Sequence, residues 1–171
     1  MSYEINCLND KIERIIMPLE IERKFLVNSS EYRNNASYFI IRQGYLCTDP
    51  DRTTRVRVYN GKGYLTIKGK TRDIAREEYE YDIPFADAER ILDNLCIKPL
   101  IEKRRYIVYD KDQKWEIDEF FGANEGLIIA EIELKSTSQK FDKPEWLGIE
   151  VSDDVRYYNS NLSVNPYSQW K

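Results

Sequence analysis

The chain has 171 residues, of which 33% are charged and 42% hydrophobic, with a formal net charge of −4 at pH 7. This composition predicts one globular domain that buries a real core, and it argues against a disordered chain. The excess of acidic residues argues against a nucleic-acid binder. Since no apolar run approaches 18 residues and no signal peptide is recognisable, we expect a cytoplasmic protein without a membrane segment.

Histidine is absent from the sequence, and this restricts the possible chemistry. A Ser–His or Cys–His nucleophile and a His-ligated zinc are excluded. Any metal must therefore be held by carboxylates, which favours hard ions such as Mg²⁺, Mn²⁺ or Ca²⁺. Cys7, Cys47 and Cys96 lie far apart, form neither a disulfide framework nor a zinc motif, and suit a reducing compartment.

Residues 1–16 are weakly patterned and form an N-terminal extension of uncertain role, whereas residues 17–171 read as a single domain. The first strong pattern is the sequence Glu20-Ile21-Glu22-Arg23-Lys24. In a β-strand, its two glutamates and its lysine point to the same side of the sheet. Carboxylates and an ammonium group at that spacing suit a site that holds a divalent cation and an anion together.

Two or three helices are expected along the chain, and two of them can be assigned to residues. Asn28-Ser29-Ser30 offers N-caps, which predicts a helix through about residue 41, followed by a short strand over 43–47. Residues 85–95 carry apolar side chains at helical spacing and predict an amphipathic helix.

Most of the remaining chain alternates between charged and apolar residues, which predicts strands. Residues 60–63 and 110–113 are turn sequences that join strands into hairpins. The tail from residue 140 is irregular. The sequence therefore predicts an α+β protein with an antiparallel sheet. The predicted strands are residues 53–59, 64–70, 76–83, 100–109, 114–120 and 127–134.

These strands carry charged residues at positions i and i+2, and each pair has one sign. Acidic pairs and basic pairs come from different strands, whereas an ordinary sheet face mixes charges with uncharged polar residues. This segregation is the main functional signal in the sequence. The pairs are Arg55/Arg57, Lys68/Lys70, Glu78/Glu80, Lys103/Arg105, Glu116/Asp118 and Glu131/Glu133.

Two architectures fit the alternation. In one, the charges face water; in the other, the sheet closes into a barrel with the charges inside and the helices outside. On a solvated face, like charges at i and i+2 add no stability to the fold, since even exposed pairs of opposite charge contribute only about 0–1 kcal/mol. Inside a barrel they need a highly charged ligand to offset their desolvation. Polyphosphate, with divalent cations held by the carboxylates, is the natural match.

The same motifs resemble those of the CYTH superfamily, the triphosphate tunnel metalloenzymes, in the family's order from about Pro18 to the C-terminus. The opening motif resembles the family's ExExK signature, and the last segment, residues 150–159, resembles that of the small bacterial members. The other matching motifs are Arg55-Val56-Arg57, Thr66-Ile67-Lys68, Glu78-Tyr79-Glu80, Lys103-Arg104-Arg105, Glu116-Ile117-Asp118 and Glu131-Ile132-Glu133.

The resemblance implies an eight-stranded antiparallel β-barrel tunnel with a charged interior and helices packed on its outside. It also implies three groups of site residues. The expected metal ligands are Glu20, Glu22, Glu131 and Glu133. The expected substrate-binding residues are Arg55, Arg57, Lys68, Lys103, Arg105 and Arg156. The expected catalytic residues are Lys24, Glu78, Glu80 and Asp118, of which the last three hold a second metal, position water or fix the basic residues by salt bridges.

The function that the resemblance implies is hydrolysis of a small-molecule triphosphate with Mg²⁺ or Mn²⁺, by a monomer or homodimer. Similarity to the small bacterial members favours inorganic tripolyphosphate, cleaved to pyrophosphate and phosphate. Within the fold, the alternatives are a class IV-type adenylate cyclase and a thiamine or nucleoside triphosphatase. From a different class, the alternative is a non-catalytic polyphosphate-binding module.

Overall fold

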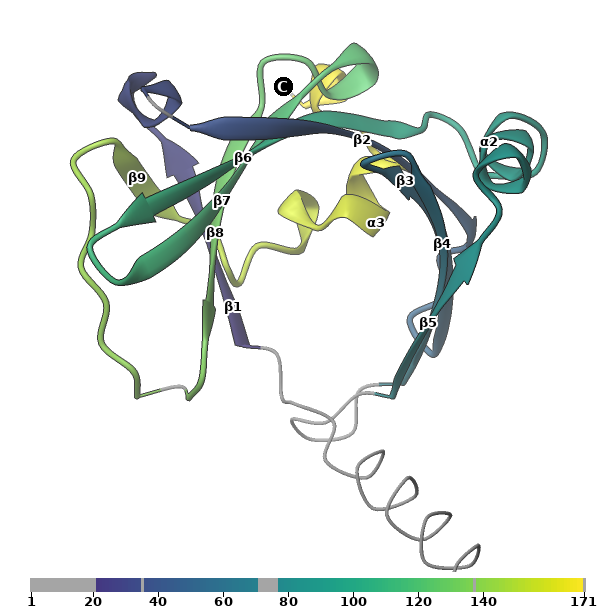
Figure 1. Ribbon diagram of the computed structural model, residues 1–171, viewed down its shortest axis with the longest axis horizontal. Helices are drawn as coiled ribbons and strands as arrows, with labels where there is room; N and C mark the ends of the chain where they lie inside the picture. The colour runs from purple at the N-terminus through teal and green to yellow at the C-terminus, as the bar shows by residue number, and fades with distance from the viewer. Residues whose placement is uncertain (1–20, 35, 71–76, 137, 171) are drawn as a thin grey trace, which may run out of the picture.

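A computed structural model describes residues 21–34, 36–70, 77–136 and 138–170. Over these residues the chain forms an antiparallel sheet of nine strands in the order β5-β4-β3-β2-β6-β7-β8-β1-β9, which curves around a central space (Figure 1). The strands are β1 (Ile21–Val27), β2 (Ser37–Cys47), β3 (Arg52–Tyr59), β4 (Lys62–Gly69), β5 (Glu78–Ile83), β6 (Ile101–Asp110), β7 (Gln113–Phe120), β8 (Ile128–Leu134) and β9 (Leu147–Glu150).

Short helices connect and cover the strands. In the described part of the chain the α-helices are α2 (Phe85–Asn94) and α3 (Asn159–Leu162). The 3₁₀ helices are η1 (Glu31–Arg33), η2 (Gly122–Asn124), η3 (Val155–Tyr157) and η4 (Tyr167–Gln169).

Strand parity places the charged residues on the concave side of the sheet. On β7, Glu116 and Asp118 alternate with Trp115 and Ile117, which are fully buried on the convex side. Because successive side chains of a strand point to opposite faces, one face of each strand builds the core and the other lines the central space. The sequence predicted this alternation, and the structure confirms it.

Two apolar layers cover the convex side and leave the charges facing inward. Phe25 and Trp115 pack with Trp146 of the C-terminal region beside β1, β7 and β8. On the other half, α2 packs Ala88 and Leu92 against β3 (Figure 1). This helix lies so close to β4 that a Cβ at Gly63 would approach the Cβ of Ala88 to 2.6 Å, so only glycine fits there.

The C-terminal segment closes one end of the central space. Leu162 of α3 is fully buried against inward-facing Tyr45, Ile101 and Phe120. The segment is fixed by Asn124, a fully buried residue whose side-chain oxygen accepts a hydrogen bond from the backbone N–H of Tyr167 at 2.8 Å. The closed end therefore depends on a contact between η2 and η4.

Substitution of Asn124 tests this anchor. Asn124→Ala leaves the partly buried N–H of Tyr167 without its acceptor, which costs about 1–3 kcal/mol. We expect a lower free energy of unfolding in urea by that amount. Asn94→Ala, at an exposed position of α2, is the control and should change stability by less than about 0.5 kcal/mol. Equal stability of the two variants would contradict the anchoring role.

The antiparallel α+β fold with inward charges agrees with expectation, α2 lies on the outside as predicted, and the predicted hairpins are present, whereas α3 packs at one end of the central space. The Asn60-Gly61 turn has positive φ at both residues, 49° and 74°, as a two-residue hairpin requires. The expected helix ending near residue 41 is wrong: only η1 forms, Ser30 makes no side-chain cap, and β2 begins at Ser37. Tyr38, Phe39 and Ile41, the apolar residues of the expected helix, lie instead in β2, a strand rich in β-branched and aromatic residues.

The sheet also differs in strand number and closure. The ninth strand, β9, lies in the tail that was expected to be irregular and pairs with β1. Among the described residues no ladder joins β5 to β1 or β9, so the sheet is curved and open there rather than a closed eight-stranded barrel. The proposed extension, residues 1–16, lies outside the described residues. No helix in the described ranges is long and apolar enough to cross a membrane.

Candidate active site

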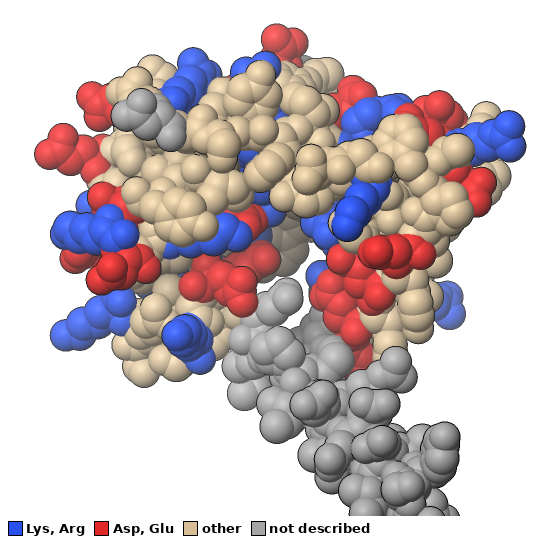
Figure 2. Space-filling model, viewed as in Figure 1, with Lys and Arg blue, Asp and Glu red and all other residues tan. Residues whose placement is uncertain are grey.

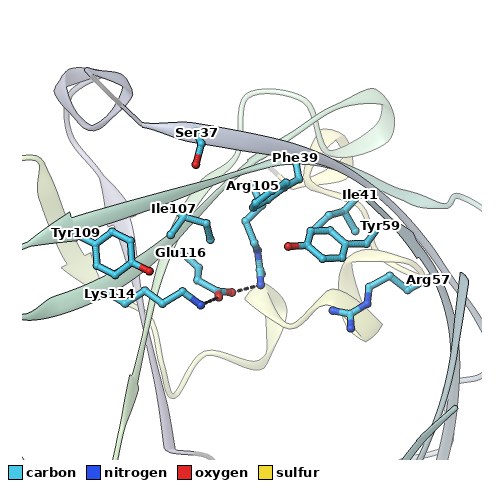
Figure 3. A pocket seen from close by; sticks show the side chains of 10 residues that line it. All are labelled: Ser37, Phe39, Ile41, Arg57, Tyr59, Arg105, Ile107, Tyr109, Lys114 and Glu116. Carbon is cyan, nitrogen blue, oxygen red and sulfur yellow. Dashed lines mark hydrogen bonds and ion pairs between the residues drawn. The ribbon is translucent and has the colours of Figure 1, made fainter. Parts of the chain in front are cut away.

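The concave face of the sheet encloses a charged cavity. Acidic and basic side chains border the hollow in the middle of the molecule (Figure 2). A cavity of about 500 Å³ opens between β2, β3, β6 and β7, away from the end that α3 closes, and Arg57, Arg105, Lys114 and Glu116 contribute its charges (Figure 3). Its remaining wall is apolar or aromatic, including Tyr59, except for Ser37.

A buried ion-pair cluster lies on β6 and β7. Arg105 donates to Asp118 through Nε at 2.7 Å and Nη2 at 2.6 Å, and Lys103 Nζ donates to the same carboxylate at 2.5 Å. The side chains of Lys103 and Asp118 are only 2% and 1% exposed. The β6–β7 register, with Arg105 directly opposite Asp118, produces this contact. Arg105 also bonds Glu116, which accepts from Lys114 at 2.6 Å (Figure 3).

The cluster continues onto β8 and β1. Glu131 accepts from Arg105 Nη2 at 3.0 Å and from Lys24 Nζ at 2.5 Å, and Lys24 also donates to Glu22 at 2.9 Å. The pairing of Lys24 with Glu131 follows from their direct opposition in the β1–β8 ladder. Residues 24, 105, 118 and 131, distant in sequence, thus form one continuous network of charges.

The charges in this network shift one another's pKa. Burial alone would raise the pKa of Asp118, but Arg105 and Lys103 hold it well below its ordinary value. Burial opposes the charge on Lys24, yet Glu131 and Glu22 raise its pKa. For Lys103, burial lowers the pKa and the neighbouring Arg105 adds to this, outweighing Asp118. The network therefore holds anionic Asp118 and cationic Lys24 firmly at neutral pH.

The opposite wall, on β3, β4 and β5, has fewer carboxylates for its cations. Arg55 and Arg57 share the carboxylate of Glu80, at 3.4 and 3.2 Å, and Thr66 also donates to it at 2.7 Å. Lys68 pairs with Glu78 at 2.6 Å. The buried Nε atoms of both arginines have no hydrogen-bond partner among the described residues.

The charge of Arg57 is only partly compensated by its surroundings. Burial lowers its pKa, and the like charges of Arg55 and Arg105 lower it further, while Glu80 opposes them. Buried polar groups are normally paired, and buried charge without full compensation is unfavourable. An anion arriving between β3 and β6 would satisfy the orphaned donors and relieve the repulsion.

The acidic residues of β1 and β8 suit a hard divalent cation. Glu22 and Glu133 lie directly opposite each other in the ladder, and like charges in that position repel. Glu133 is exposed and makes no ion pair with any described residue, so its oxygens are available. The positive charges of Lys24, Lys68 and Arg105 outweigh burial and keep the pKa of Glu22 below its ordinary value. Carboxylate donors of this kind fit Mg²⁺ or Mn²⁺.

The structure brings together most of the predicted site residues. Glu20 and Arg156 are the exceptions. Glu20 lies outside the described residues, and among the described ones no three carboxylates converge as a complete metal cluster. Arg156 pairs with Asp154 within the η3 turn at 2.6 Å and stacks on Trp170, so no described contact connects it with the other charges.

The three residues of open role all contact cations. Asp118 pairs with Lys103 and Arg105. Glu80 pairs with Arg55 and Arg57. Glu78 pairs with Lys68. Of the roles left open by the sequence, salt bridges that fix the basic residues match these contacts.

Sequence reasoning missed several participants. Glu116 was recognised as part of a pair with Asp118 but was given no role, although the same i, i+2 parity places it on the cavity wall. Gln43 lies buried on the concave face of β2, in a segment correctly predicted as a strand, but it carries no charge and so the charge pattern could not identify it. Thr66 carries no charge, so the charge pattern could not identify it as a partner of Glu80.

Comparison with known proteins agrees with this architecture. A protein of Acetivibrio thermocellus named inorganic triphosphatase is 52% identical over 155 residues, which cover 91% of this chain and 99% of that protein. An inorganic triphosphatase of Nitrosomonas europaea is 34% identical and covers 85% of this chain and 97% of its own length. The crystal structure of the inorganic triphosphatase NE1496 superposes with a TM-score of 0.68 at 33% identity, covering 86% and 96% of the two chains.

Residues 18–161 match the CYTH domain, which includes every strand and every charged pair described above. The match covers most of the chain, and the solved neighbour supports the same tunnel fold, with its charged concave face, for the open sheet seen here. On these grounds the chain belongs to the CYTH family.

Proposed function

We propose that this protein is a divalent-metal-dependent inorganic triphosphatase that cleaves tripolyphosphate to pyrophosphate and phosphate. Two relatives are named inorganic triphosphatase, and the alignment with this chain covers nearly the whole length of each. The observation that carries the proposal is the asymmetry between the walls: under-compensated Arg55 and Arg57 face a wall that carries the acidic pair Glu22 and Glu133. Such a site suits a polyanion accompanied by a metal ion.

The basic residues would bind the phosphate chain. Arg55 and Arg57 hold buried Nε donors directed at no described acceptor, and Arg105 lines the cavity opposite them. Arginine presents several donors in a planar fork, which matches phosphate oxygens. During in-line displacement at the terminal phosphorus, these donors stabilise charge on the phosphoryl group and on the departing pyrophosphate.

The buried carboxylates would position those donors. Asp118 holds Lys103 and Arg105 from one side, and Glu80 holds Arg55 and Arg57 from the other. Preorganised donors stabilise developing charge without reorganising during the reaction. We assign Asp118, Glu78 and Glu80 to this positioning role rather than to direct contact with substrate.

The divalent cation, Mg²⁺ or Mn²⁺, would be held by the carboxylates of Glu22, Glu131 and Glu133, with Glu20 as a further predicted ligand. When bound, the ion neutralises phosphate charge and activates water. A glutamate on this side orients the attacking water, and Lys24, between Glu22 and Glu131, supplies positive charge beside the terminal phosphate. With no histidine in the chain, a phosphohistidine intermediate has no place in this reaction.

Parallel assays of tripolyphosphate, ATP and thiamine triphosphate with Mg²⁺ or Mn²⁺ test the proposal. We expect phosphate release from tripolyphosphate to exceed release from the other two. Cyclic AMP and pyrophosphate from ATP would identify a cyclase instead, and preferred cleavage of ATP or thiamine triphosphate would identify an organic triphosphatase. Binding without turnover of any of the three would identify a binding module.

Glu133→Ala tests the metal site. Mutation of residues that hydrogen-bond metal ligands typically lowers metal affinity or activity about 10- to 100-fold. Loss of a residue that ligates the metal directly should therefore lower kcat by more than about 100-fold. The variant should fold, because Glu133 is exposed and makes no described ion pair. Glu125→Ala, at an exposed loop position, is the control. Full activity of folded Glu133→Ala would remove this residue from the site.

A further inference from the structure

Glu131 joins two cations that come from two other strands. One carboxylate oxygen accepts from Lys24 Nζ at 2.5 Å, and the other accepts from Arg105 Nη2 at 3.0 Å. The Glu131 side chain is only 12% exposed, so solvent competes little for either contact. Both oxygens of a predicted metal ligand are therefore engaged by residues predicted to act on the phosphate chain.

These contacts compete with the binding of a metal ion. A carboxylate oxygen must direct its lone pair at a divalent cation to ligate it, and here each oxygen faces a side-chain cation instead. A doubly charged ion at this position also repels Lys24 and Arg105. Once displaced from Glu131, Lys24 keeps only its ion pair with Glu22, which is itself a predicted metal ligand. The guanidinium of Arg105, freed from Glu131, then has a donor available to the cavity that it lines.

We infer that Glu131 makes the site select the metal complex of triphosphate over the free anion. Without a divalent cation, Glu131 competes with phosphate for Lys24 and Arg105; with one, it gives up both contacts, so that Lys24 and Nη2 of Arg105 can bond phosphate oxygens while Glu22 and Asp118 keep their own contacts with these cations. Metal and anion then raise each other's affinity by the same factor, since coupling between two sites is reciprocal. This inference rests on the proposed function and adds to it the species that the site accepts.

Binding without metal provides the test. Tripolyphosphate is titrated calorimetrically into the full-length protein in the presence of EDTA, comparing wild type with Glu131→Gln. The variant removes the negative charge but keeps a similar shape, and Lys24 and Arg105 keep Glu22 and Asp118, so the fold should persist. We expect about ten-fold tighter binding of free tripolyphosphate by Glu131→Gln than by wild type, within the usual range of coupling between sites.

Glu133→Gln is the matched control, because it removes the same charge two residues further along β8, where no ion pair with a described residue is present. It should gain much less affinity for the free anion. Equal gains in affinity in the two variants would mean that only the change in net charge matters, and this would overturn the inference. An affinity of Glu131→Gln equal to that of wild type would overturn it as well.

A second measurement keeps the inference testable if Glu131→Gln does not fold. Mg²⁺ is titrated alone into Lys24→Gln and Lys114→Gln, each of which removes one cation near the carboxylates. Lys24 contacts Glu131, whereas Lys114 contacts Glu116 at 2.6 Å. We expect Lys24→Gln to gain more Mg²⁺ affinity over wild type, and equal gains would overturn the inference.

Failure of the inference is distinguishable from failure of the proposed function. If wild type with Mg²⁺ hydrolyses tripolyphosphate while Glu131→Gln and Glu133→Gln bind the free anion alike, only the role of Glu131 is lost. If wild type with Mg²⁺ neither binds nor cleaves tripolyphosphate, the proposed function fails, and the inference fails with it.

Discussion

Arg105→Lys is expected to lower kcat for tripolyphosphate by about 100- to 1,000-fold, although the positive charge is kept. Loss of one preorganised donor to developing charge has an effect of about this size. Arg105 uses its fork to bond Asp118 through two nitrogens and to reach Glu116 and Glu131, and a lysine ammonium cannot reproduce that geometry. The measurement is phosphate release under saturating substrate and metal.

The neighbouring residue provides a matched control. Arg104 points to the convex side, where its guanidinium lies over the Tyr38 ring at 4.9 Å and it donates to the Tyr106 hydroxyl at 3.3 Å. Arg104→Lys changes the same atoms one position away and should leave kcat within a few-fold of wild type. If both variants lose activity alike, the effect is structural; if neither does, Arg105 does not act on the phosphate chain.

The contrast between these two arginines shows what the sequence contains. The i, i+2 spacing of Lys103 and Arg105 predicted that both face the same side and that Arg104 does not, and the structure confirms this parity. Side-chain period in a strand is fixed by backbone geometry, so charge alternation shows which side chains share a face without knowledge of the fold. For this reason the charges of β3, β4, β6, β7 and β8 could each be assigned to one face of their strand, whereas the alternation alone fits both a solvated face and a barrel interior.

Features that depend on the surroundings of a strand could not be predicted. Tyr38, Phe39 and Ile41 follow three possible N-cap residues, and local signals favoured a helix, but pairing of β2 with both β3 and β6 makes it a central strand. Tertiary pairing overrides weak local preference. Likewise, β9 is only four residues long and exists because β1 offers it an edge.

The burial of Asp118 was also beyond the sequence, because nothing in a Glu-Ile-Asp motif distinguishes a solvated carboxylate from one that is 1% exposed. Breaking a buried ion pair by removing one partner costs about 3–5 kcal/mol, because the remaining charges are left uncompensated. We therefore expect Asp118→Asn to lower the free energy of unfolding at pH 7 by about that amount. Urea unfolding measures the difference, with Asp112→Asn in the exposed β6–β7 turn as the control.

The same variant predicts a specific dependence on pH. Burial raises the pKa of Asp118 in the folded protein, but Arg105 and Lys103 outweigh it and hold that pKa well below its ordinary value. In the unfolded chain it returns to about 3.9. As pH falls below about 4, Asp118 becomes protonated in the unfolded chain but stays ionised in the folded protein. The contribution of Asp118 to stability, complete at neutral pH, is therefore lost progressively.

The stability gap between wild type and Asp118→Asn should therefore be constant from pH 7 to about 5 and narrow below about 4. Asparagine does not titrate, so subtracting the variant's curve removes the contributions of the other carboxylates that are independent of Asp118, as distant sites contribute additively. A gap that stays constant down to pH 3 would mean that Asp118 does not stabilise the fold as an anion. That result would also remove the reason for Lys103 and Arg105 to be held in place, and with it the positioning role assigned to this carboxylate.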